Sequence, residues 1–160
     1  MRYNACPIFF YGPLLEASKA AFDSKDLKEH RPILVYIHND KSMLNNIFCK
    51  TTLCAELIIE YLQENYLVWP WDITLQSNRN RLLTIWKEIF VFPLLSDFSV
   101  DKYPMLFGIT RRFPVKKCWL PTVQYEFTSL VKGDKLIRTQ ETITLNAFLS
   151  ELIAFKEECD

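Results

Sequence analysis

The sequence predicts a single α/β domain that spans residues 1–160. A continuous run of β-branched and aromatic residues from Ile33 to Ile37 is typical of a central strand that is covered on both faces. Segments with apolar residues at helical spacing alternate with further strand-like runs. We therefore expect the order helix, strand, helix, strand, helix, strand, strand, helix, in a chain long enough to bury roughly two-thirds of its unfolded surface.

The first half of the chain is expected to place an arm and a helix before the central strand. Residues 1–30 are interpreted as this extended arm and N-terminal helix, with Gly12 and Pro13 at the start of the helix. After the central strand, Ser42 to Glu64 shows a helical pattern, and threonines near position 51 indicate a break between two helical pieces.

The second half is expected to complete the sheet and cover it. Residues 66–74 are expected to form a second strand, and Pro70 within it favours a position at the sheet edge or a strand that ends early. Ser77 is expected to cap the next helix. The remaining elements are strands at 103–110 and 123–131 and a final helix that begins near residue 144.

Composition excludes several classes of function. Lys+Arg and Asp+Glu are equal at 19 each, so the molecule has no net field to attract nucleic acid. The five cysteines form no Cys-x-x-Cys pair, and we expect no cleavable signal peptide, which favours a reducing compartment, cytoplasmic or nuclear. With two histidines at unsuitable spacing we expect no metal and no cofactor, and no apolar run approaches the ~18 residues of a membrane span.

The junction after the central strand is where thioredoxin-type proteins carry a Cys-x-x-Cys pair. Here the junction reads Asn-Asp-Lys-Ser-Met-Leu from Asn39 onward, and a serine cannot perform thiol–disulfide exchange. Cys49 and Cys54 lie roughly 140° apart around an α-helix, so we interpret them as core residues. A hydrolase triad of His38, Asp40 and Ser42 is disfavoured, because such neighbours at a helix start are more simply explained as caps.

Several blocks of the sequence resemble one known family. "PIFFYGPLLEASKAAF", "ILVYIHND", "FCKTTLCAELIIEYL" and "WPWDIT" followed by "SNR" are similar to successive parts of the UAS domain, with the closest resemblance to the Fas-associated factor branch of the UBX-protein family. The resemblance implies a thioredoxin-like fold, with a mixed central sheet flanked by helices and an extra N-terminal helix. It also implies a cis peptide bond at Tyr103-Pro104, immediately before the third strand.

The same resemblance implies a function without catalysis. The UAS domain is associated with long-chain unsaturated fatty acids, which promote its self-association. The full-length adaptors act in ubiquitin-dependent degradation, where other domains bind ubiquitinated substrates and recruit the AAA ATPase valosin-containing protein.

A basic segment after the third strand is the candidate ligand-binding site. Its cations, Arg111, Arg112, Lys116 and Lys117, stand beside apolar residues, a combination that suits an amphiphile with an anionic head. An ordinary charged loop is the alternative interpretation.

Two other functions remain open from the sequence. The first is a divergent thiol oxidoreductase that uses Cys49 or Cys54. The second is a lipid-independent protein-interaction module that docks a peptide on the basic segment or on "WPWD", where we expect Trp69 and Trp71 on opposite faces of their strand.

Overall fold

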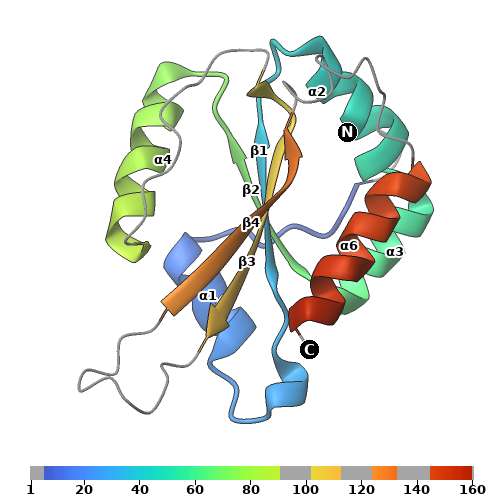
Figure 1. Ribbon diagram of the computed structural model, residues 1–160. Helices are drawn as coiled ribbons and strands as arrows, with labels where there is room; N and C mark the ends of the chain where they lie inside the picture. The colour runs from blue at the N-terminus through green and yellow to red at the C-terminus, as the bar shows by residue number, and fades with distance from the viewer. Residues whose placement is uncertain (1–5, 91–101, 113–123, 133–144, 160) are drawn as a thin grey trace.

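The computed structural model describes residues 6–90, 102–112, 124–132 and 145–159. Within these ranges a central sheet separates two groups of helices (Figure 1). The strands are β1 (Ile33–His38), β2 (Leu67–Asp72), β3 (Met105–Arg112) and β4 (Gln124–Lys132). The α-helices are α1 (Leu14–Phe22), α2 (Met43–Phe48), α3 (Glu56–Asn65), α4 (Gln76–Ile89) and α6 (Leu145–Cys159), and a short 3₁₀ helix covers Leu27–Glu29.

The sheet is mixed and has the strand order β2-β1-β3-β4. β1 is parallel to β2 and antiparallel to β3, and β4 is antiparallel to β3. The apolar run of β1 is buried because this strand is central and both of its faces are covered by helices. β2 lies at the edge beside β1, which confirms the position inferred from Pro70.

Helices cover the sheet from two sides (Figure 1). On one side α1 and α4 pack against alternate residues of the strands, with Trp69, Trp86 and Phe107 in the cluster. On the other side α2, α3 and α6 pack against the intervening residues, with Tyr36 and Phe148 in that cluster. Successive side chains of a strand point to opposite faces of the sheet, so alternate residues of the same strands belong to the two clusters. The predicted thioredoxin-like α/β fold is therefore confirmed.

The N-terminal arm runs along the sheet edge before α1 begins. The backbone N–H of Phe10 donates to the carbonyl oxygen of Val68 over 2.7 Å, and Phe9 forms a parallel bridge with the same residue. The indole Nε1 of Trp69 donates to the carbonyl oxygen of Gly12 over 2.9 Å. These bonds fix the arm on β2 and place α1 against the sheet, as an extra helix that precedes the first strand.

The start of α4 differs from the prediction. Leu75 is the N-cap residue and offers no side-chain hydrogen bond, whereas Ser77 lies one residue inside the helix and is exposed. The prediction that Ser77 caps this helix was wrong. Arg79 takes over part of the stabilisation of the turn, because its Nε donates to the carbonyl oxygen of Ile73 over 2.8 Å.

Candidate functional site

Ser42 occupies the junction between β1 and α2. Its Oγ accepts a hydrogen bond from the backbone N–H of Asn45 over 3.1 Å, so it caps the helix as predicted. The same hydroxyl donates to the carbonyl oxygen of Tyr103 over 3.1 Å. The Tyr103-Pro104 peptide bond is cis, as the family resemblance implied. The junction and the turn before β3 are thus joined by a serine hydroxyl.

The other polar residues of the junction also serve the backbone. Asn39 is fully buried, its N–H donates to Oδ1 of Asn45 over 2.8 Å, and its own Oδ1 accepts from the N–H of Lys41 over 3.1 Å. The N–H of Asp40 donates to Oγ1 of Thr74 over 2.9 Å, which ties the end of β1 to the end of β2. These side chains hold the loop together, and none of them supplies a thiol.

Beneath the junction lies a buried polar cluster that the sequence analysis did not identify. The hydroxyl of Tyr36 lies 2.6 Å from Nδ1 of His38 and accepts from Nδ2 of Asn45 over 2.7 Å. Sγ of Cys49 is in hydrogen-bond contact with the same hydroxyl and lies 3.8 Å from Nδ1 of His38. Nε2 of His38 lies 3.3 Å from Oδ1 of Asp40.

One arrangement of protons satisfies this whole cluster. If Nε2 of His38 carries the ring proton and donates to Asp40, Nδ1 accepts from the Tyr36 hydroxyl. The hydroxyl oxygen then accepts from Asn45 and from the S–H of Cys49. In this arrangement Cys49 acts as a protonated donor, whereas a nucleophile requires the thiolate. Cys49 is also buried, at 3% exposure.

The helix at Cys49 is not an α-helix, and this changes the geometry expected for the cysteines. Cys49–Leu53 forms a π-helical turn in which the N–H of Cys54 donates to the carbonyl oxygen of Cys49 over 3.0 Å. The expectation of a 140° separation was therefore wrong, because residues five apart are about one turn apart in a π-helix. Burial, and then electrostatic interaction with the thiols of Cys49 and Cys6, raise the pKa of Cys54 to about 11.

The structure does not assemble the hydrolase triad. His38 does pair with Asp40, but the hydroxyl of Ser42 is engaged with Asn45 and Tyr103. None of the cysteines that the structure describes forms a disulfide bond. Among the described residues there is no group of three metal-binding side chains. None of the described helices combines the length and the apolar content that a membrane span requires.

Arg111, the first cation of the basic segment, lies at the end of β3 and is bound to α1. Its Nη1 pairs with Oδ1 of Asp23 at 2.7 Å, and its Nη2 donates to the carbonyl oxygen of Phe22 over 2.6 Å. The guanidinium also lies 5.7 Å from the centre of the Phe22 ring. Its side chain is 15% exposed, and that of Asp23 is 51% exposed. Arg111 therefore has a structural role at this edge of the sheet.

The remaining predicted site residues are only partly described. The backbone of Arg112 belongs to β3, but its side chain lies outside the described part of the structure. Lys116 and Lys117 lie outside the described residues altogether. The grouping of the four cations stays a prediction.

The two tryptophans of "WPWD" share a face of β2, which corrects the expectation of opposite faces. Trp69 and Trp71 stack with ring centres 5.4 Å apart and an angle of 12° between planes, because residues two apart in a strand point the same way. Trp69 is buried, and Nε1 of Trp71 donates to the carbonyl oxygen of Asn78 over 2.8 Å. Both rings therefore belong to the packing of the fold.

Comparison with known proteins places the chain in one group. The family model for Fas-associated factor 1 matches residues 1–153. FAS-associated factor 1 of Homo sapiens is 39% identical over 108 residues, which cover 65% of this chain and 16% of the relative. UBX domain-containing protein 3 of Caenorhabditis elegans is 42% identical over 72 residues, which cover 45% of this chain and 12% of the relative.

A third relative is similar over a shorter part of the chain. FAS-associated factor 2 of Homo sapiens is 37% identical over 66 residues, 41% of this chain and 14% of the relative. The chain thus spans less than a fifth of the length of each of these curated relatives. Because the family model covers nearly all of the chain, this protein belongs to the Fas-associated factor 1 family.

Proposed function

We propose that this chain is a UAS domain that serves as a non-catalytic binding and assembly module of a ubiquitin-pathway adaptor, in the cytoplasm or nucleus. The observation that carries the proposal is the junction at Asn39–Ser42. The scaffold usually presents a reactive thiol pair there, and here the side chains cap a helix and tie loops together. Family membership supports the adaptor assignment, since relatives include a UBX domain-containing protein.

The proposed ligand is a long-chain unsaturated fatty acid, and its binding promotes self-association. The carboxylate pairs with the cations Arg111, Arg112, Lys116 and Lys117, while the acyl chain covers apolar surface and bridges two copies. Burial of the chain supplies ~0.8 kcal/mol per methylene. The exposed charge pairing adds less and mainly orients the head group.

The geometry of Arg111 limits its share in this mechanism. Its Nη1 and Nη2 are already engaged with Asp23 and with the carbonyl oxygen of Phe22. The carboxylate of Asp23 is half exposed and competes with an incoming carboxylate for the same fork. We therefore expect Arg112 and the two lysines to contribute more to ligand capture than Arg111.

Sedimentation velocity with and without oleate tests the proposal. The parent chain should shift to larger species with oleate, and a variant with all four cations changed to alanine should not. Asp23→Ala is the matched comparison: it leaves every cation of the segment in place and removes the competing carboxylate, so it should respond to oleate at least as strongly as the parent. The fatty-acid proposal is rejected if oleate leaves the parent monomeric, or if the four-cation variant responds like the parent.

The two rival functions have separate tests. A divergent thiol oxidoreductase that uses Cys49 or Cys54 requires a reactive thiolate, which alkylation and disulfide reduction assays detect. A lipid-independent protein-interaction module would capture its partner equally with and without added oleate in a pull-down. In the full-length protein, ubiquitinated substrates and valosin-containing protein are proposed to bind through other domains.

A further inference from the structure

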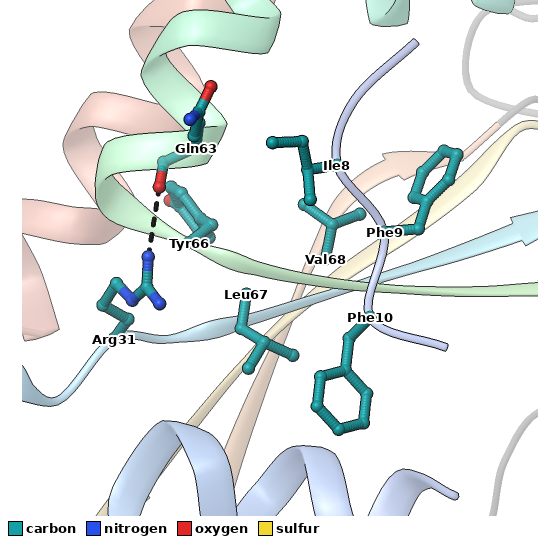
Figure 2. A pocket seen from close by; sticks show the side chains of 8 residues that line it. All are labelled: Ile8, Phe9, Phe10, Arg31, Gln63, Tyr66, Leu67 and Val68. Atoms are coloured by element: carbon teal, nitrogen blue, oxygen red, sulfur yellow. Dashed lines mark hydrogen bonds between the residues drawn. The ribbon is translucent and has the colours of Figure 1, made fainter. Parts of the chain in front are cut away.

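A pocket of about 280 Å³ lies between the N-terminal arm and the start of β2 (Figure 2). Its walls are mainly apolar, and its lining residues are Ile8, Phe9, Phe10, Arg31, Gln63, Tyr66, Leu67 and Val68. In Figure 2 the side chains of Ile8 and Val68 lie close together beside the arm, and the guanidinium of Arg31 faces the end of α3.

Arg31 is held in a fixed position at this pocket. Its backbone N–H donates to the carbonyl oxygen of Ala21 over 3.2 Å, and its Nη1 donates to the carbonyl oxygen of Gln63 over 3.1 Å. The next residue, Pro32, accepts a hydrogen bond from the N–H of Leu67 over 3.0 Å. The guanidinium is therefore oriented before any ligand arrives, which lowers the cost of binding.

The guanidinium also has capacity left for a ligand. It carries five N–H donors, and within the described part of the chain one of them has a protein acceptor, the carbonyl oxygen of Gln63. No acidic residue is among the lining residues that the structure describes, so the positive charge of Arg31 is not neutralised from the pocket wall. A planar fork of this kind matches a carboxylate.

The size and the walls of the pocket limit the ligand further. Its volume lies just below the ~300–1,000 Å³ usual for ligand pockets. Ile8, which is 65% exposed, provides an apolar rim. With one cation among the described lining residues, the charge is matched by a monoanion better than by a dianionic phosphate.

We propose that this pocket binds a compact monocarboxylate with an apolar body, which pairs with Arg31 and packs against the exposed side chain of Ile8 beside the edge of β2. The proposal does not depend on the fatty-acid site proposed above. Its ligand binds one copy of the chain and does not drive self-association.

Calorimetric titration with octanoate tests this proposal, with octan-1-ol and acetate as matched probes. Octanoate should bind, while the uncharged alcohol and the short acid should each bind at least about tenfold more weakly. Arg31→Gln should weaken octanoate binding by at least about tenfold, and Arg31→Lys by less, since the charge remains and the fork is lost. Arg81→Gln, on the exposed face of α4, is the control and should bind like the parent.

Amide chemical shifts in the NMR spectrum of the parent chain locate the ligand without any variant. Octanoate should shift residues of the arm and of β2, foremost Ile8 and Val68, and sedimentation should show no larger species. Equal binding of octanol and octanoate, an affinity unchanged in Arg31→Gln, or shifts confined to another surface would each overturn the proposal. If the parent chain binds octanoate but does not self-associate with oleate, only the oleate site proposed at the basic segment is rejected.

Discussion

The hydroxyl of Ser42 joins the start of α2 to the carbonyl oxygen of Tyr103, 61 residues further along the chain, over 3.1 Å. The same oxygen accepts from the N–H of Asn45. A single side chain thus stabilises the helix start and the turn before β3. This relationship gives a polar side chain a structural role at the junction where thioredoxin-type proteins carry their thiols.

Removal of this hydroxyl should lower stability. We expect Ser42→Ala to lose ~1–2 kcal/mol of the free energy of unfolding, because it removes a helix cap and leaves a buried carbonyl without its donor. Urea denaturation measures the loss. Ser77→Ala is the control, since Ser77 is exposed and does not cap α4, and it should change stability by less than ~0.5 kcal/mol. Equal effects of the two substitutions would contradict the structural role of Ser42.

The hydroxyl of Tyr36 is expected to matter through the buried polar cluster. Tyr36→Phe keeps the ring but removes the group that contacts Asn45, His38 and Cys49. Nδ2 of Asn45 then loses its 2.7 Å acceptor and keeps only the longer contacts to Nδ1 of His38 and Sγ of Cys49, which should cost ~0.5–1.5 kcal/mol in urea denaturation. Tyr11→Phe, at a site with 83% exposure, is the matched control and should be neutral. A neutral Tyr36→Phe would show that the cluster does not stabilise the fold.

Any side chain larger than hydrogen at Gly108 is expected to lower the stability of the fold. A Cβ at this position of β3 would lie 2.5 Å from Cε1 of Phe155 on α6, so Gly108→Ala should cost ~1–3 kcal/mol through overpacking. The same substitution should cost less in a Phe155→Leu background, because the ring atoms are gone. Gly12→Ala meets a side-chain atom of Phe10 at 3.1 Å and should be milder. Additive effects of Gly108→Ala and Phe155→Leu would contradict the contact.

Cys54 should be unreactive at neutral pH. Its pKa of about 11 leaves roughly one thiolate in 10⁴ molecules at pH 7, and alkylation followed by mass spectrometry should show a rate that rises as the pH approaches 11. Exposed Cys6 serves as the internal comparison and should react first. Rapid labelling of Cys54 at pH 7 would contradict the effect of burial.

The same pKa predicts how stability depends on pH. The ordinary pKa of a cysteine thiol, 9.0, lies below the folded pKa of Cys54, so the unfolded chain releases this proton first as the pH rises. The contribution of Cys54 to stability is therefore constant below pH 9 and decreases between pH 9 and pH 11. Urea denaturation across this range should show the decrease, and a Cys54→Ala variant should show less of it.

Much of the fold could be predicted from patterns of burial. The apolar run of β1 was informative because both faces of that strand are covered, and Pro70 was informative because a residue without an N–H fits an edge. The π-helical turn at Cys49 could not be predicted, because it depends on a backbone hydrogen-bond shift that leaves little trace in hydrophobic spacing. The prediction of the α4 cap failed because the sequence indicates where the first turn of a helix lies but not which residue begins it.

The buried polar cluster was missed although its signal was present. Tyr36 and His38 lie two apart in a strand, and Asn45 and Cys49 lie four apart in a helix, so each pair shares a face. The sequence could not show that these two faces meet, because that depends on how α2 returns over the sheet. For the basic segment the reverse holds. Its charges are evident in the sequence, but its side-chain geometry is described only as far as Arg111.

The insulin reduction assay tests most directly whether this chain lacks thiol–disulfide oxidoreductase activity. The purified chain with dithiothreitol should reduce insulin no faster than dithiothreitol by itself, and a Cys49→Ser, Cys54→Ser double variant should behave the same. Reduction at a thioredoxin-like rate that disappears in the double variant would contradict the account and identify the chain as an oxidoreductase.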